Sequence, residues 1–251
     1  GRARADDAAL VYYHPITQYP LAVRTTPARR AELMAWAETS GAWIVEGNFN
    51  DEITYDRNAP GALWSTSDSD RVLLRGTFEG IMYPALRLAY LVVPERLADV
   101  FVAMRGLLGD HSNTALQLAL AWFIDEGHLA THLRNLRQVG REHRDALRAS
   151  CARHLPPWAR LGPLDSGFHA CIHLPTDVSD RDVIKAMREG GVLAISLSSG
   201  CIDPTHGNGL VIGFGAFDAL TIDRSVAVIG RALQAAVRSA AGPHQRAGEK
   251  R

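Results

Sequence analysis

Short apolar segments that alternate with helical segments are the feature that most constrains the fold of this chain. The segments of strand length in the first part are residues 8–13, 43–45, 72–75 and 88–93. Between the first two, Thr26 is a favourable helix N-cap and Pro27 suits the first helical position, which predicts a helix over residues 26–38. Strands that alternate with helices in this way predict an α/β fold with a mostly parallel sheet covered by helices.

The pattern changes after Pro94 and becomes helical over a long distance. The expected helices are residues 95–107, 112–124 and 129–154. A smaller α+β part follows, with expected strands at 167–174, 192–197 and 210–214 and expected helices at 179–189 and 222–240. We therefore predict a partial large domain over 8–125, a connecting helix and small C-terminal domain over 126–240, and a mobile tail over 241–251.

Composition excludes several classes of protein. The 251 residues include 27 Lys and Arg against 27 Asp and Glu, so no basic footprint for nucleic acid is visible. No apolar run approaches the roughly 20 residues of a membrane span, and we expect a cytoplasmic protein. The three cysteines lack Cys-x-x-Cys spacing, which argues against a disulfide framework or a structural zinc site and favours free thiols.

One strand offers a possible metal site. His169, Cys171 and His173 alternate along it and so point to one face, a geometry that could present three ligands. The alternative is that these side chains pack in a core or at a pocket edge, which we favour. His128 and His132 share a helix face but lack the Glu of a metalloprotease motif. No metal site is predicted.

The segment at residues 76–90 reads GTFEGIMYPALRLAY. It resembles the pyridoxal-phosphate attachment segment, Gly-Thr-Phe-Ser-Lys-x-Leu-x-Pro-x-Leu-Arg-Leu-Gly-Tyr, in the aminotransferase-like half of MocR/GabR-type bacterial regulators. Three further segments are similar to that family: residues 14–20 (HPITQYP), 127–137 (GHLATHLRNLR) and 208–214 (NGLVIGF). The resemblance implies the back half of a fold-type-I aminotransferase large domain, followed by the small domain.

The chain departs from the family where the chemistry should be. In the resemblance Gly80 stands at the lysine position, Gly47 at the aspartate that pairs with the pyridine nitrogen, and Phe49 at the tyrosine that bonds the ring oxygen. Without an amine at position 80 no Schiff base can form there. The two lysines of the chain, Lys185 and Lys250, are expected to be solvated surface residues. We therefore predict no catalytic residue, no covalent cofactor and little binding of pyridoxal phosphate.

An anion-binding site could survive. The family's threonine and arginine that bind the cofactor phosphate correspond to Thr77 and Arg87. The alternative is that Arg87 is an ordinary surface or ion-paired arginine. The complete predicted effector site consists of Gln18, Asn48, Phe49, Thr77, Glu79 and Arg87. Two charge-assisted hydrogen bonds of roughly 1.5–3 kcal/mol each would give a dissociation constant on the order of millimolar or somewhat tighter.

These observations lead to one hypothesis with two alternatives. The leading hypothesis is a pseudoenzyme that senses a small anionic or amino-bearing effector non-covalently, as a domain of a MocR/GntR-type transcriptional regulator. The alternatives are a pyridoxal-phosphate-dependent aminotransferase that retains activity, and a structural partner subunit. Since nothing before residue 8 resembles the first part of the family's large domain, we expect a homo-oligomer, a complementing chain or a longer gene product. No membrane or nucleic-acid partner is expected for this chain itself.

Overall fold

The computed structural model describes residues 8–48, 52–55, 61–109, 111–203 and 207–241. The chain divides into two compact units, the first made of residues 1–18 and 23–137, and the second of residues 19–22 and 138–251. The chain passes from the first unit to the second inside the long helix α5 (His128–His154), whereas the sequence placed the start of the second domain at residue 126.

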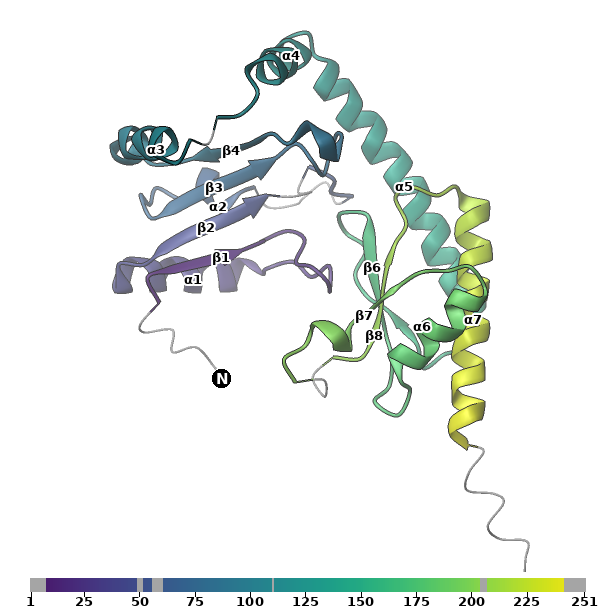
Figure 1. Ribbon diagram of the computed structural model, residues 1–251. Helices are drawn as coiled ribbons and strands as arrows, with labels where there is room; N and C mark the ends of the chain where they lie inside the picture. Colours follow the sequence, from purple (N-terminus) through teal and green to yellow (C-terminus); the bar gives the residue numbers. More distant parts are fainter. Residues whose placement is uncertain (1–7, 49–51, 56–60, 110, 204–206, 242–251) are drawn as a thin grey trace, which may run out of the picture. The chain divides into compact units, whose positions relative to one another are not determined.

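A four-stranded sheet of order β1-β2-β3-β4 forms the first unit (Figure 1). Its strands are β1 (Leu10–Tyr13), β2 (Trp43–Asn48), β3 (Val72–Thr77) and β4 (Ala89–Val92). The first three strands are parallel, which confirms the mostly parallel sheet, and β4 runs antiparallel to β3. The sequence did not predict this reversal. It follows from the short connection between β3 and β4, because a parallel return needs a crossover of a dozen or more residues.

Helix α1 (Pro27–Ser40) covers one face of this sheet. As predicted, Thr26 caps it: the Thr26 side chain accepts a hydrogen bond from the Arg29 amide, and Gly41 ends the helix with a φ of 73°. A buried cluster joins the helix to the strands and to the short helix α2 (Leu63–Thr66). Its buried members are Ala37, Ile44, Leu63 and Val72, and the partly buried members are Val11, Tyr13, Leu33, Met34 and Trp36.

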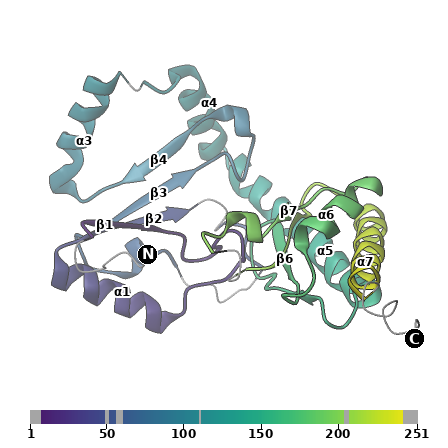
Figure 2. The ribbon, with the colours of Figure 1, turned by 60° about the horizontal axis from the view of Figure 1, so that its bottom comes forward.

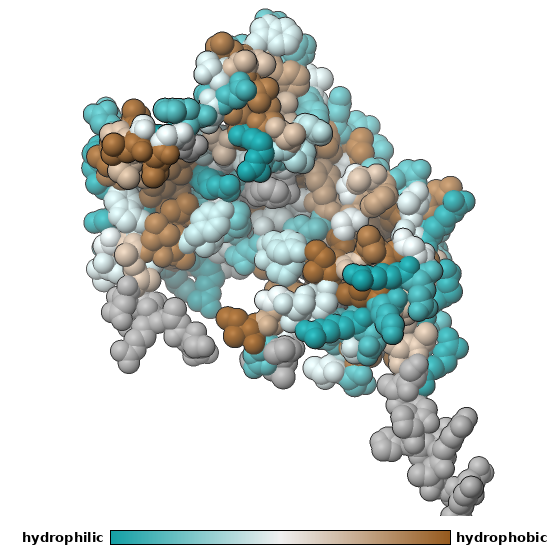
Figure 3. Space-filling view, viewed as in Figure 1, coloured by the Kyte–Doolittle hydropathy of each residue, from teal (hydrophilic) through white to brown (hydrophobic). Residues whose placement is uncertain are grey.

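Two helices of the first unit present apolar side chains to solvent. They are α3 (Glu95–Leu108), in which no residue is buried, and α4 (Thr114–Asp125), in which only Leu120 is. Leu107 and Leu108 are 81% and 74% exposed, and Figure 3 shows the hydrophobic surface that gathers over this region. Other exposed members are Val100, Val102, Met104, Leu118 and Trp122.

The second unit contains an antiparallel sheet of order β5-β6-β8-β7. The strands are β5 (Arg160–Leu161), β6 (His169–His173), β7 (Ile195–Ser196) and β8 (Gly209–Gly213). Helix α6 (Asp180–Glu189), helix α7 (Ala219–Ala241), the later part of α5 and the short helical turn η3 (Ser198–Gly200) complete the unit (Figure 2). Asp223 of α7 ties that helix to α5, because its carboxylate accepts hydrogen bonds from Ser150 and Arg153 and contacts the His154 ring. The expected small α+β domain is thus present.

The cysteines are free, and burial raises the pKa of the Cys151 thiol to about 12 and that of Cys171 to about 11. Cys201 is partly exposed. The thiolate is the reactive form, so we expect a disulfide reagent at pH 8 to modify Cys201 at least tenfold faster than the other two. Mass spectrometry of the labelled chain checks this order. Equal labelling of all three thiols in the folded protein would contradict the buried placement of Cys151 and Cys171.

Within the described residues, no helix is both long and apolar enough to cross a membrane. Nor do the His, Cys, Asp and Glu side chains of the described part come together in a group that could hold a metal ion, and this holds for His169, Cys171 and His173.

Candidate functional site

The predicted site residues Asn48 and Thr77 lie at the carboxyl ends of two neighbouring parallel strands. Asn48 ends β2 and pairs in register with Gly76, next to Thr77 at the end of β3. In open sheets of parallel strands, ligands bind in the crevice outside these carboxyl ends. The sheet therefore brings Asn48 and Thr77 together at the edge where a ligand site is expected (Figure 1).

The loop that follows β3 brings Thr77, Glu79 and Arg87 together. An Arg87 guanidinium nitrogen lies 3.1 Å from the Glu79 carboxylate, with the arginine side chain 80% and the glutamate side chain 28% exposed. The Thr77 hydroxyl is buried, donates to the Leu88 carbonyl at 3.4 Å and accepts from the Glu79 amide at 3.3 Å. Arg87 is thus ion-paired, which was the alternative that the sequence left open, and it pairs with another predicted member of the site.

The backbone of Arg87 adopts a left-handed conformation, with a φ of 53°. It directly follows the short 3-10 helix η2 (Pro84–Leu86). A residue with a Cβ atom is strained in this region by about 1 kcal/mol or more, and such outliers occur most often at functional sites. Among the described non-glycine residues, Ala22 also has a positive φ, of 55°, and of the two only Arg87 was singled out for anion binding by the family resemblance.

Two other predicted residues, Gln18 and Asn48, are engaged in contacts of their own. The Gln18 amide donates to the Thr25 hydroxyl at 3.0 Å, and Gln18 forms an isolated β-bridge with Val23. The Asn48 amide donates to the Glu52 carboxylate at 3.0 Å. Phe49 lies outside the described residues.

The space beside Gly47 is filled by side chains from β1 and the residue after it. A Cβ atom added at Gly47 would lie 2.5 Å from the His14 ring and 2.7 Å from the Tyr12 hydroxyl. The two rings meet edge to face at 5.1 Å, and Arg75 contacts the Tyr12 hydroxyl at 3.4 Å. Burial lowers the pKa of His14, a hydrogen bond with the Gly47 backbone opposes this, and the Arg75 charge lowers the pKa further. A carboxylate side chain at position 47 would therefore require His14 and Tyr12 to move.

Two residues of α5 support the loops of this site, and sequence reasoning missed both roles. A ring nitrogen of His132 lies 2.6 Å from the Ile81 carbonyl, one residue beyond Gly80. The Arg137 guanidinium donates to the Glu52 carbonyl at 2.6 Å, in the loop after β2. From the sequence, His132 was considered only for a metal motif with His128, and Arg137 was given no separate role. The only signal in the sequence was that both residues lie in the segment at 127–137, which is similar to the MocR/GabR-type family.

No family model matches this chain. It is similar to the probable rhizopine catabolism regulatory protein MocR of Rhizobium meliloti, with 31% identity over 238 residues, which cover 95% of this chain and 48% of the relative. It is also similar to the pyridoxine biosynthesis transcriptional regulator PdxR of Corynebacterium glutamicum, with 30% identity over 234 residues, which cover 92% of this chain and 50% of the relative.

Solved aminotransferases share its fold. The multiple substrate aminotransferase of Thermococcus profundus superposes with a TM-score of 0.84 at 20% identity, over 92% of this chain and 57% of that one. LysN, the α-aminoadipate aminotransferase of Thermus thermophilus, gives a TM-score of 0.80 at 23% identity, over 92% of this chain and 60% of that one.

The fold is thus that of the pyridoxal-phosphate-dependent aminotransferases, present in part. The homologues of the chain are GntR regulators of the MocR and PdxR type, as the segment at residues 76–90 predicted. The chain spans about half the length of these curated relatives.

Proposed function

We propose that this chain is the aminotransferase-like domain of a MocR/GntR-type regulator, and that it senses a small effector without covalent chemistry. The homologues and the fold support the first part of this proposal. The observation that carries the second part is the packing of His14 and Tyr12 against Gly47.

The residues present do not suit pyridoxal phosphate as a working cofactor. The cofactor acts as an electron sink when a carboxylate keeps its pyridine nitrogen protonated. The corresponding position is Gly47, and the space for a side chain there is taken by the His14 ring. Gly80, at the position that resembles the lysine, has no amine to condense with an aldehyde. These two features support non-covalent binding over catalysis.

The ion pair between Arg87 and Glu79 defines the effector that the site would take. An anionic group must compete with Glu79 for the guanidinium, and an exposed pair of this kind contributes only about 0–1 kcal/mol. A charge-assisted hydrogen bond from Arg87 to a phosphate contributes roughly 1.5–3 kcal/mol, which exceeds the pair it replaces. The displaced Glu79 carboxylate can then accept a hydrogen bond from an amine. A small molecule that carries both an anion and an amine fits this pair best.

The proposal includes an assembled form of the protein. The exposed apolar side chains of α3 and α4 support either a second copy of the chain or a complementing polypeptide that covers them. A purely structural partner role would use the same surface but would need no ion pair at Arg87.

Calorimetry with pyridoxamine 5′-phosphate tests the effector site, because this probe carries a phosphate and an amine but no aldehyde. We expect binding with a dissociation constant on the order of millimolar. Arg87→Gln should weaken it about tenfold, and Glu79→Gln should strengthen the binding of inorganic phosphate several-fold by removing the competing carboxylate. Arg96→Gln is the matched control, since Arg96 is also exposed and pairs with an aspartate, Asp70.

Two results would overturn the proposal. The first is no heat of binding for the probe in a folded sample, or binding that Arg87→Gln leaves unchanged. The second is an absorption band of an internal aldimine on addition of pyridoxal phosphate, with borohydride trapping the coenzyme on Lys185. The second result would favour an active aminotransferase.

A further inference from the structure

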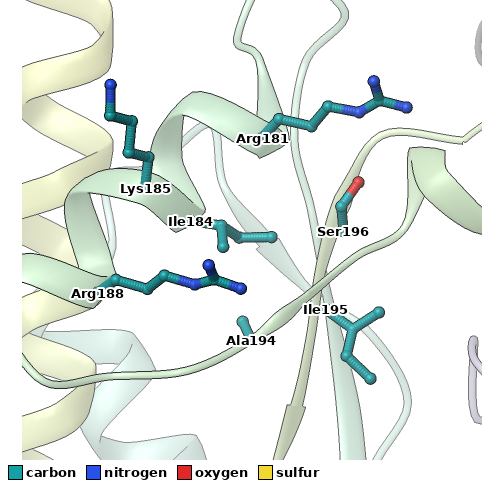
Figure 4. Close-up of a pocket in the computed structure, with 7 residues that line it drawn as sticks. All are labelled: Arg181, Ile184, Lys185, Arg188, Ala194, Ile195 and Ser196. Carbon is teal, nitrogen blue, oxygen red and sulfur yellow. The ribbon is translucent and has the colours of Figure 1, made fainter.

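An open groove lies between helix α6 and the edge strand β7, wholly within the second unit (Figure 4). Its volume is about 430 Å³. Strand β7 is the last strand of its sheet, so its outer side has no neighbouring strand. None of the residues that line this groove was singled out as part of the effector site.

The rim of the groove is cationic. Arg181, Lys185 and Arg188 occupy positions i, i+4 and i+7 of α6 and are exposed. In Figure 4 the two guanidinium groups extend toward β7 on either side of Ile184, while the Lys185 amine points away from the strand. Among the described residues, no acidic side chain pairs with these three cations. In contrast, Arg29, Arg30, Arg87, Arg96, Arg144, Arg148 and Arg153 each have one.

The floor of the groove is apolar. Ile184 is buried and lies between the two arginines, and Ala194 faces it from the strand side. Ile195 also lines the groove, but its side chain points away from Ile184 (Figure 4). Ile195 is 57% exposed. A cationic rim over an apolar floor selects molecules that have an anionic end and an apolar body.

The walls of the groove are held in place by a buried carboxylate. Asp180, at the start of α6, is 2% exposed and accepts hydrogen bonds from the Ser196 hydroxyl of β7 and from the Ser198 amide and hydroxyl of η3, each at 2.9 Å. The Gly209 amide adds a longer contact at 3.4 Å. Because these bonds join the helix to the strand, the groove keeps its shape without a ligand, which lowers the entropic cost of binding.

We infer that this groove binds a small amphipathic anion, a phosphate or carboxylate that carries an aromatic or aliphatic body. Arg181 and Arg188 hold the anionic group, and Ile184 and Ala194 contact the apolar body. The groove shares no residue with the ion pair of Arg87 and Glu79. The chain would thus have two anion sites that differ in the second group they recognise. The groove binds an anion that carries an apolar body, whereas the Arg87 site binds an anion that carries an amine.

Nuclear magnetic resonance titration of the ¹⁵N-labelled 251-residue chain tests the inference. The probe is phenyl phosphate, with inorganic phosphate and phenol as its two halves. We expect phenyl phosphate to shift the amide signals of Ile184, Ala194 and Ile195 with half-saturation between ~0.1 and ~5 mM. Each half alone should bind at least fivefold more weakly, because it lacks either the charge or the apolar contact.

Variants decide the roles of the side chains. The double variant Arg181→Gln/Arg188→Gln should weaken phenyl phosphate binding about tenfold, whereas Arg231→Gln, at an exposed arginine of α7 in the same unit, should leave it unchanged. Ala194→Met should fill the floor and weaken phenyl phosphate more than inorganic phosphate.

Three outcomes would overturn the inference: no shift of these amides at about 20 mM phenyl phosphate, equal affinity for phosphate and phenyl phosphate, or unchanged binding in the double arginine variant. All the substitutions are at exposed or partly exposed positions, so folding of each variant can be verified from its unperturbed amide spectrum.

Discussion

Replacing Glu46 with alanine is expected to lower the free energy of unfolding by about 3–5 kcal/mol. Glu46 is 1% exposed in the middle of β2, and its carboxylate accepts hydrogen bonds from the Leu63 and Trp64 amides at 2.7 and 2.9 Å. It also lies 3.6 Å from the buried Arg30 guanidinium. Removing the carboxylate leaves two amides at the start of α2 without their acceptor and a buried cation without its counter-charge. Urea denaturation measures the loss.

The matched control is Glu32→Ala. Glu32 also pairs with an arginine, Arg29 at 2.6 Å, but both side chains are more than half exposed, and a change within about 0.5 kcal/mol is expected. Glu46→Gln should fall between the two because the amide oxygen keeps one acceptor. If Glu46→Ala and Glu32→Ala lose the same small amount, the buried carboxylate does not stabilise the first unit as described.

The second large effect is expected at Asp180. Asp180→Ala should lower the free energy of unfolding by about 3 kcal/mol or more. The substitution removes the acceptor for the Ser198 amide and for the Ser196 and Ser198 hydroxyls at once. Asp182→Ala is the control, since Asp182 lies in the same turn of α6 but is exposed. If Asp180→Ala lowers the free energy of unfolding no more than Asp182→Ala does, Asp180 does not hold α6 to β7 and η3 as described.

The same carboxylate makes this stability depend on pH. Burial alone would raise the pKa of Asp180, but the hydrogen bonds from Ser198, Ser196 and Gly209 outweigh it and hold the pKa below its ordinary value. The folded protein therefore binds this proton less readily than the unfolded chain. The contribution is fully present above the unfolded pKa of about 3.9 and is lost as pH falls through the lower folded pKa. The difference between wild type and Asp180→Asn should shrink below pH 4, and a difference that grows there would oppose this assignment.

The sequence predicted the order and kind of the elements well because their signals are local. Thr26 and Pro27 mark the start of α1, and the apolar strands around Ile44 and Val72 are recognisable from their composition alone. The antiparallel return of β4 was missed because strand direction depends on the length of a connection that holds only the short 3-10 helix η2 and no α-helix. The sequence does not show where the chain passes between the two units inside α5, because a continuous helix carries no local sign of which core each turn contacts.

For the site, the sequence predicted positions better than contacts. The family resemblance placed Asn48 and Thr77 in one predicted site, and the register of the sheet sets them at the ends of neighbouring parallel strands. The sequence could not tell that Glu79 pairs with Arg87, since the pair depends on the path of the loop between them. The packing of His14 against Gly47 is also invisible in the sequence, because it joins the residue after β1 to a residue of β2 through the register of the sheet.

The apolar surface of α3 and α4 has a thermodynamic consequence for whatever covers it. Removing hydrocarbon from water is driven by entropy near room temperature and decreases the heat capacity. An association through Leu107, Leu108 and their neighbours would therefore tighten as the solution is warmed from the cold, and kosmotropic salts such as sulfate would strengthen it. Temperature and salt type, more than ionic strength, would set the assembly state of this protein.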